Sequence, residues 1–170
     1  VPGLSFDTGP CLRFPRQAQF HPLAYVNALA AAIERTEGQA IRRAHVTGIE
    51  PGPPARIATD VGPTVTADVV VCATNAPIVD WLATDKKQTA FRTFAIGARV
   101  PSGAVPRGLY WDTADPYHYV RLHGDVLVVG GEDCETGHED DGAERLHCLE
   151  AWARERFPIG AVEFCWSGQV

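Results

Sequence analysis

Two phenols, a guanidinium and an imidazole occupy alternate positions of one short segment, at Tyr117, Tyr119, Arg121 and His123. Residues two apart in a β-strand share a face, so these side chains would line up together. Arginine binds a carboxylate through two parallel hydrogen bonds, so this face could position an organic acid or amine. The alternative is a half-exposed sheet face, because aromatic residues and arginine suit pleated surfaces.

A second segment that could contact a ligand comes directly after an apolar run. Ala73, Thr74 and Asn75 follow the segment 65–72, which is typical of a buried strand. Small residues after a strand let the backbone approach a ligand closely, and Thr or Asn can add a hydrogen bond. The alternative is an ordinary turn, since short motifs often match by chance.

Other common chemistries lack the residues that they need. Gly130–Gly131 is followed by acidic residues and not by the Gly-Lys-Ser/Thr of a phosphate loop, and no G-x-S-x-G of a hydrolase occurs. The zinc-ligand types are scattered, with two of them adjacent on a predicted helix, where they would point about 100° apart. They are Cys134, His138, His147 and Cys148. We assign no catalytic residue and no metal ligand.

Composition limits the class of protein. The chain has 170 residues, of which 45% are hydrophobic and 21% charged, as in an ordinary globular domain. A net charge of -6 argues against nucleic-acid binding, and no apolar run is long enough to span a membrane. Five cysteines without short paired spacing favour a reducing cytoplasm. Because the chain starts at Val1 and contains no Met, we expect it to be an internal piece of a longer protein.

The first half of the chain predicts two helices and three strands. Apolar residues at helical spacing begin at Pro22, which suits a first helical turn, and Gly38 ends the helix near Glu37. Segments rich in β-branched residues predict a meander of strands at 41–49, 55–65 and 65–73, the last buried on both faces. A short helix at 77–82 follows.

The second half predicts a strand-rich block. Strands are expected at 91–100 and 108–111, with a hairpin that joins 117–122 to 126–131. A helix runs from the acidic residues 139–141 to about Phe157, where Pro158 stops it, and a last strand covers 161–166. We predict an α+β fold with a mixed, largely antiparallel sheet flanked by helices.

The order of these elements resembles that of a known family. An Ala-rich helix, Gly38, a strand over His45–Ile49 and the run Ala67–Val70 are similar to the middle of D-amino-acid-oxidase-like FAD-dependent oxidoreductases. The segments 97–101, 109–117 and 129–133 most resemble a bacterial branch sometimes fused to a Rieske iron–sulfur domain. No Cys-x-His or Cys-x-x-His pair of a Rieske centre occurs in this chain, so such a domain would lie downstream.

The resemblance implies an FAD site and a substrate site. The residues that it assigns to FAD are Val46, Ala73, Thr74 and Asn75. It places Tyr119, Glu132, Asp133 and His21 at or near the substrate pocket. Tyr117 and Arg121 join this predicted pocket because they share a strand face with Tyr119. For His21, a capping or packing role at the start of the helix is the alternative.

We therefore expect two portions: residues 1–83 as part of the FAD domain, and residues 84–170 as the substrate-binding portion. The intact enzyme would oxidise an amine, amino acid or related small molecule by hydride transfer to flavin. Its partners would be that substrate and the rest of the parent flavoprotein, with no nucleic acid and no membrane. No G-x-G-x-x-G occurs, so we expect weak or no FAD binding and no activity from this chain alone.

A rival interpretation is a stand-alone module that binds a small ligand or a protein through the face containing Tyr117 and Arg121. Open strand edges could also drive self-association of such a module.

Overall fold

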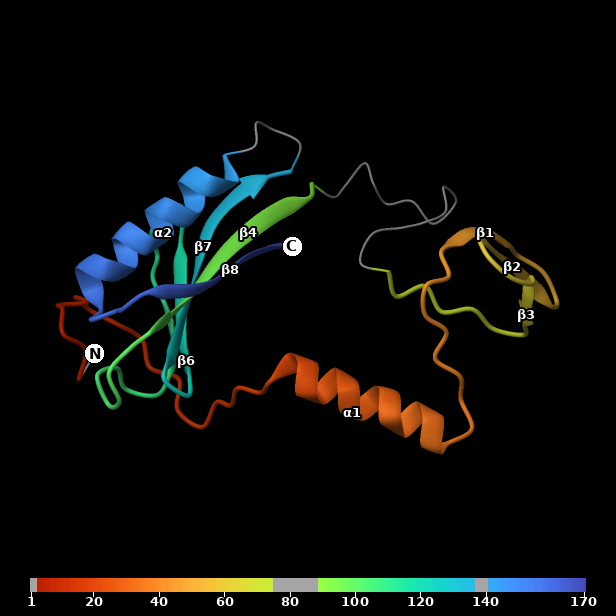
Figure 1. The fold of residues 1–170 in the computed structure, drawn as a ribbon, viewed down its shortest axis with the longest axis horizontal. Helices are drawn as coiled ribbons and strands as arrows, with labels where there is room; N and C mark the ends of the chain where they lie inside the picture. Colours follow the sequence, from red (N-terminus) through yellow and green to blue (C-terminus); the bar gives the residue numbers. More distant parts are fainter. Residues whose placement is uncertain (1–2, 75–88, 137–140) are drawn as a thin grey trace. The chain divides into compact units, whose positions relative to one another are not determined.

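The computed structural model describes residues 3–74, 89–136 and 141–170. Two compact units share the chain (Figure 1). One consists of Ala18–Gln88, and the other combines Val1–Gln17 with Thr89–Val170. The N-terminal segment Val1–Gln17 thus belongs to the same unit as the second half of the chain. The division into an FAD portion and a substrate-binding portion stays a prediction.

The unit Ala18–Gln88 contains one helix and a small sheet. Helix α1 spans Pro22–Arg35, and the Nδ1 atom of His21 accepts a hydrogen bond from the Ala24 amide at 3.2 Å. Strands β1 (Val46–Glu50), β2 (Ala55–Thr59) and β3 (Val65–Ala67) form the predicted antiparallel meander. His21 therefore caps the helix, as its alternative interpretation proposed.

The strand expected over residues 65–73 is wrong in length and in burial. It ends at Ala67, and Val69 and Val71 are 78% and 83% exposed. Cys72 is exposed as well, contrary to its expected place inside an apolar strand. A strand buried on both faces needs neighbouring strands and covering helices, and β3 pairs with β2 alone among the described residues. The helix predicted at 77–82 lies outside the described residues.

The second unit is a five-stranded antiparallel sheet with one helix. Its strands are β4 (Phe91–Arg99), β5 (Leu109–Trp111), β6 (His118–His123), β7 (Val126–Glu135) and β8 (Val162–Gln169), in the order β5-β6-β7-β4-β8. Helix α2, Gly142–Arg156, lies alongside β4 and β7 (Figure 1). The α+β class is confirmed, and every strand pair in the described part of the chain is antiparallel.

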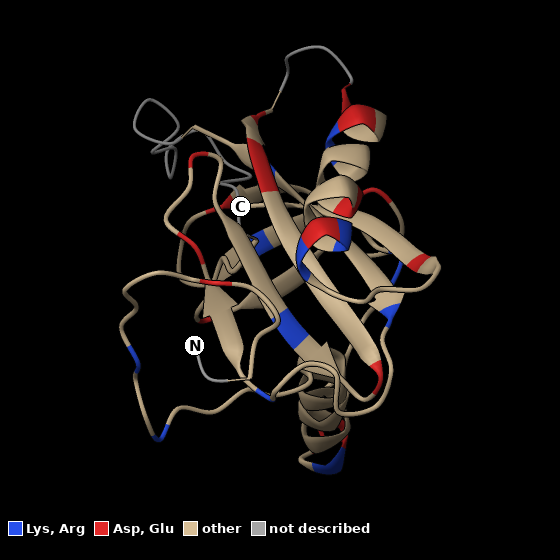
Figure 2. Ribbon diagram, turned by 90° about the vertical axis from the view of Figure 1, so that its left-hand side faces the viewer, with Lys and Arg blue, Asp and Glu red and all other residues tan. Residues whose placement is uncertain are grey.

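The core of this unit fills the space between α2 and the sheet. Leu149 and Ala153 of α2 are fully buried, together with Leu127 and Val129 of β7 and Ile96 of β4. The N-terminal segment completes this core, since Leu4 and Phe6 pack against it. The Phe6 ring meets Phe157 edge to face, with 5.4 Å between ring centres. Helix α2 carries charges of both signs on its other surfaces (Figure 2).

The predicted hairpin is present, and a two-residue turn joins its strands. His123 pairs with Val126, and Gly124 between them has φ 58°, a left-handed conformation that glycine adopts without strain. This turn sets the register of β6 against β7. It therefore decides which of the predicted site residues face the same side of the sheet.

Candidate functional site

A row of paired residues crosses the sheet from β5 to β8. Trp111 pairs with Tyr119, Tyr119 with Gly130, Gly130 with Ala95, and Ala95 with Trp166. Directly paired residues of antiparallel strands point to the same face. The sequence neighbours of the row's central members are core residues beneath α2. The row therefore lies on the face of the sheet opposite the helix.

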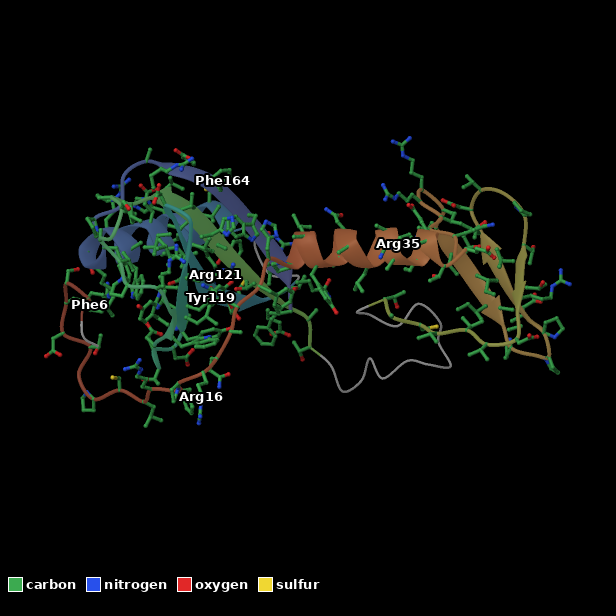
Figure 3. The ribbon with its side chains drawn as sticks, turned by 90° about the horizontal axis from the view of Figure 1, so that it is seen from below. Phe6, Arg16, Arg35, Tyr119, Arg121 and Phe164 are labelled. Carbon is green, nitrogen blue, oxygen red and sulfur yellow. The ribbon has the colours of Figure 1, made fainter. Side chains whose placement is uncertain are left out.

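A second row runs beside the first on this face. Leu109 pairs with Arg121, Arg121 with Val128, Val128 with Gly97, and Gly97 with Phe164. Figure 3 labels Tyr119 and Arg121, which come from β6, and Phe164, which comes from β8. We call the large side chains of both rows, with Tyr117, the aromatic face: Leu109, Trp111, Tyr117, Tyr119, Arg121, Phe164 and Trp166.

The side chains of the aromatic face are much more exposed than those of a hydrophobic core. Trp111 is 68% exposed, Phe164 50% and Trp166 47%. Large aromatic groups gathered on one exposed face mark a surface that binds a partner or a ligand. Arg121, half-buried in the second row, adds a fixed positive charge to this apolar surface.

Small residues in the middle of the sheet let aromatic rings lie flat across it. A Cβ atom added to Gly130 would collide with the Tyr119 ring, and one added to Gly97 would lie 3.1 Å from Cδ2 of Phe164. The Tyr119 hydroxyl reaches across β7 to Thr93, at 3.3 Å from its Oγ1. These contacts hold Tyr119 in one orientation on the aromatic face.

A phenol and a carboxylate meet at the end of this face. The Tyr117 hydroxyl donates a hydrogen bond to Oδ2 of Asp133 at 3.0 Å. This bond, followed by burial, raises the pKa of Tyr117 above its ordinary value. The other carboxylate oxygen, Oδ1, is buried and has no hydrogen-bond partner in the part of the chain that the structure describes. Asp133 can therefore accept a hydrogen bond from a ligand.

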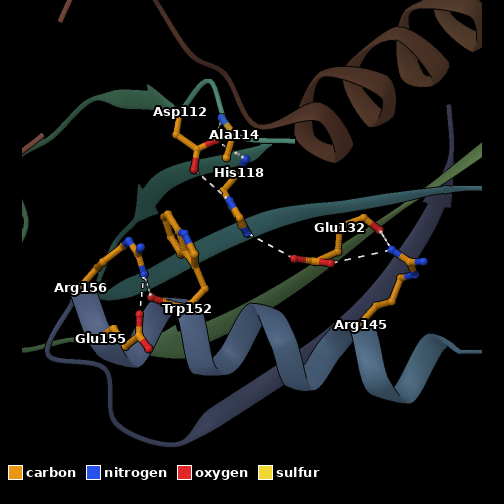
Figure 4. A network of polar contacts seen from close by, with 8 residues as sticks. All are labelled: Asp112, Ala114, His118, Glu132, Arg145, Trp152, Glu155 and Arg156. Carbon is orange, nitrogen blue, oxygen red and sulfur yellow. Dashed lines mark hydrogen bonds and ion pairs between the residues drawn. The ribbon is translucent and has the colours of Figure 1, made fainter. Parts of the chain in front are cut away.

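The opposite side of the sheet carries a polar network centred on His118 (Figure 4). This imidazole is 6% exposed; its Nδ1 lies 2.9 Å from Oδ2 of Asp112, and its Nε2 lies 3.4 Å from Oε1 of Glu132. The ring stacks on Trp152 with 4.3 Å between centres, and the Arg156 guanidinium covers the indole at 4.5 Å. The network joins β6, β7 and α2 to Asp112, the residue that follows β5.

Four of the six residues predicted to contact substrate are brought together. Tyr117, Tyr119 and Arg121 lie on the aromatic face, and Asp133 joins them through Tyr117. Glu132 does not, because its carboxylate lies on the α2 side, near His118 and Arg145. His21 caps α1 in the other unit. Contact of any of these residues with a substrate stays a prediction.

The structure describes three of the four residues predicted to contact FAD. Val46 begins β1 and pairs with Thr59, with a bulge before Gly48. Ala73 and Thr74 are exposed and lie outside any helix or strand. Asn75 lies outside the described residues. Their contact with FAD also stays a prediction.

The sequence analysis did not identify several residues of the aromatic face and of the polar network on the α2 side of the sheet. Phe164 and Trp166 are two apart, which is the spacing that identified Tyr119 and Arg121, and would have placed them on one face. His118 alternates with Val120 and Leu122, so its place on the apolar side of β6 was also readable. Nothing in the local sequence indicates that Arg145 reaches Glu132.

Two other kinds of feature, a metal site and a membrane-spanning helix, are absent from residues 3–74, 89–136 and 141–170. No group of three or more His, Cys, Asp or Glu residues there is placed to hold a metal ion. In the same ranges, no helix combines the length and apolar character that crossing a membrane requires.

Comparison with known proteins gives one family and one relative. The chain is 23% identical over 158 residues to the "Putative Rieske 2Fe-2S iron-sulfur protein YhfW" of Bacillus subtilis (strain 168). The match covers 90% of this chain and 31% of the relative, so the chain spans about a third of that protein's length. No solved structure matches. The model of the DAO family, described as FAD dependent oxidoreductase, matches residues 1–170, and the chain belongs to that family.

Proposed function

We propose that this chain is the substrate-binding middle portion of an FAD-dependent oxidoreductase that oxidises an amine, an amino acid or a related small molecule. Family membership supports the oxidoreductase class. The single observation that supports the substrate role is the aromatic face, which combines exposed rings with Arg121 and Asp133. Arg121 would bind a carboxylate, and the free oxygen of Asp133 would accept a hydrogen bond from an amine.

The residues suit one end of FAD better than the other. A flat aromatic surface can pack against a planar ring such as that of the flavin. The pyrophosphate has no matching cradle, because no G-x-G-x-x-G occurs in the sequence. We therefore propose that the chain by itself binds FAD weakly or not at all and has no activity. In the intact protein, bound FAD would supply the redox chemistry by accepting a hydride.

The tasks proposed for this face differ from one group of side chains to the next. Tyr119, held over Gly130, would present a rigid ring that orients the substrate and excludes water from it. Arg121 would fix the carboxylate end, and the Tyr117–Asp133 pair would hold the amine end. The exposed tryptophans Trp111 and Trp166 would widen the apolar contact around these groups.

The decisive experiment replaces Arg121 in the intact flavoprotein and follows flavin reduction by two substrates. Arg121→Ala should lower kcat/KM for a carboxylate-bearing amine by about tenfold or more, because a hydrogen bond to a charged group contributes about 1.5–3 kcal/mol. The same change should affect a plain amine much less. Arg107→Ala, at an exposed position, is the matched control.

Equal losses for both substrates would contradict the role of Arg121 as a carboxylate ligand. A second measurement addresses the chain alone: titration with FAD should show no binding at micromolar concentration. Binding at micromolar concentration or tighter would overturn the proposal that this chain lacks a working cofactor site.

A further inference from the structure

Glu132 has a backbone conformation that glutamate rarely adopts. Its φ is 54°, in the left-handed region, and it sits where β7 has one more residue than its partner β4. Arg92 pairs with Cys134 and Phe94 with Gly131, so that Glu132 and Asp133 both lie opposite Thr93. A non-glycine residue in the left-handed region is strained, and this conformation persists only when the surroundings hold it.

Contacts from two directions hold Glu132 in this conformation (Figure 4). Nη1 of Arg145 lies 3.4 Å from the Glu132 carbonyl oxygen and 3.8 Å from its Oε2. Nε2 of His118 lies 3.4 Å from Oε1. Both side chains are themselves anchored, Arg145 by Asp141 at 2.6 Å and His118 by Asp112 at 2.9 Å. The carbonyl group and the carboxylate of Glu132 therefore both have contacts on the α2 side of the sheet.

Because of the bulge, Asp133 and not Glu132 faces the aromatic side of the sheet. Gly131 pairs with Phe94 and His118, both on the α2 side, and Glu132 points to that side too. Two consecutive residues on one side break the alternation of the strand. Asp133 consequently turns to the aromatic face, where it accepts the hydrogen bond from Tyr117.

The neighbouring glycine leaves no room for another arrangement. A Cβ atom added to Gly131, which has φ 142°, would collide with the carbonyl oxygen of Tyr117. The main chains of β6 and β7 therefore approach closely beside the bulge. A change in the backbone of Glu132 would be passed directly to Asp133 and to Tyr117.

We propose that Glu132 is a positioning residue, held by Arg145 and His118 on one side of the sheet so that the Tyr117–Asp133 pair is presented on the other. The link to substrate binding rests on the proposed function. The positioning of Asp133 by Glu132 does not depend on that function. Glu132 itself would touch no substrate.

The test follows the ionisation of Tyr117 by NMR of tyrosine ring carbons in the full chain, with Tyr117→Phe for assignment. Asp133→Asn removes the acceptor carboxylate and defines the full decrease in the Tyr117 pKa. In Glu132→Gly, glycine can adopt the same backbone conformation, but the carboxylate that contacts Arg145 and His118 is lost. The Tyr117 pKa should therefore move down toward its ordinary value. Arg145→Met should also lower it.

The two variants separate positioning from a simple effect of charge. Loss of the Glu132 carboxylate removes a negative charge and would lower the Tyr117 pKa by electrostatics alone. Loss of the Arg145 guanidinium removes a positive charge and would raise it. A decrease in both variants therefore supports positioning. Glu135→Gln, an exposed residue of the same strand, controls for charge and should change the pKa least.

An unchanged Tyr117 pKa in Glu132→Gly, or an increase in Arg145→Met, would overturn the inference. Circular dichroism and slow amide exchange of buried Val129 establish that each variant keeps the sheet. If Arg145→Met does not fold, Arg145→Lys replaces it. Lysine keeps the positive charge but lacks the planar guanidinium group, so a decrease in the Tyr117 pKa is again expected. The measurement needs neither flavin nor substrate, so failure of the proposed function would leave its outcome unaffected.

Discussion

The ring of Tyr119 lies across Gly130, its direct partner in the neighbouring strand. The absence of a side chain at Gly130 lets the phenol cross β7 and bring its hydroxyl to Thr93 of β4. One residue type on the middle strand thus determines the orientation of a large side chain from the next. The aromatic face depends on this relationship, because a displaced Tyr119 would disturb the whole row from Trp111 to Trp166.

Gly130→Ala should displace the Tyr119 ring and destabilise the protein. The added Cβ atom collides with that ring, and overpacking of this kind costs about 1–3 kcal/mol. Urea unfolding measures the change. Gly168→Ala is the control, since no atom lies within 4 Å of the Cβ position there, and its effect should stay within about 0.5 kcal/mol. Equal effects of both changes would contradict the proposed contact.

Leu149→Ala should cause the largest loss of stability among single changes in α2. Leu149 is fully buried against the sheet, and leucine truncation in a core costs about 2–5 kcal/mol. The urea midpoint should fall while the denaturant slope stays constant. Leu12, which is 87% exposed, provides the comparison, and Leu12→Ala should leave the midpoint nearly unchanged. A loss below about 1 kcal/mol for Leu149→Ala would argue against the packing of α2 described above.

Tyr110 should make stability fall at alkaline pH. Burial raises the pKa of this phenol in the folded protein, and its hydroxyl donates to the Pro106 carbonyl at 2.8 Å. The folded state then retains a proton that the unfolded state releases near pH 10, so this contribution is complete below about pH 10 and is lost as pH rises through the folded-state pKa.

Tyr110→Phe checks this contribution. Removing the hydroxyl should cost about 1 kcal/mol at pH 8, where the hydrogen bond is intact. Urea unfolding from pH 8 to pH 11 should then show a smaller decrease in stability for the variant than for the wild type. If stability falls equally with pH in the two proteins, Tyr110 is not the cause of the alkaline loss of stability.

The ion pair between Arg99 and Glu163 should contribute little. Nε of Arg99 lies 3.0 Å from Oε2 of Glu163, but the two side chains are 56% and 38% exposed. Exposed pairs contribute about 0–1 kcal/mol and are screened by salt. Glu163→Gln should therefore cost no more than about 1 kcal/mol in low salt. The difference should shrink when urea unfolding is repeated in high salt, and a larger, salt-independent loss would contradict this expectation.

Local sequence predicted most of the elements. Pro22 does begin α1, Gly124 does form the hairpin turn, and α2 ends just before Pro158. These signals are reliable because each depends on the backbone of one residue: proline fixes φ, and glycine adopts positive φ without strain. The pairing of β6 with β7 followed from the turn, since its length sets the register.

Burial was predicted less well because it depends on what packs against a segment. The apolar run 65–73 has the composition of an inner strand, yet only Val65–Ala67 pair, and Val71 is 83% exposed. Apolar composition alone does not bury a residue when no other element covers it.

The sequence by itself determined the family, the α+β class and the alternation that places Tyr117, Tyr119 and Arg121 together. Only the tertiary structure decided the sides on which Glu132 and Asp133 lie. Alternation along β7 would have placed them the other way round. A bulge against β4, stabilised by Arg145 of helix α2, reverses that order, because one extra residue in a strand changes the face of every residue after it.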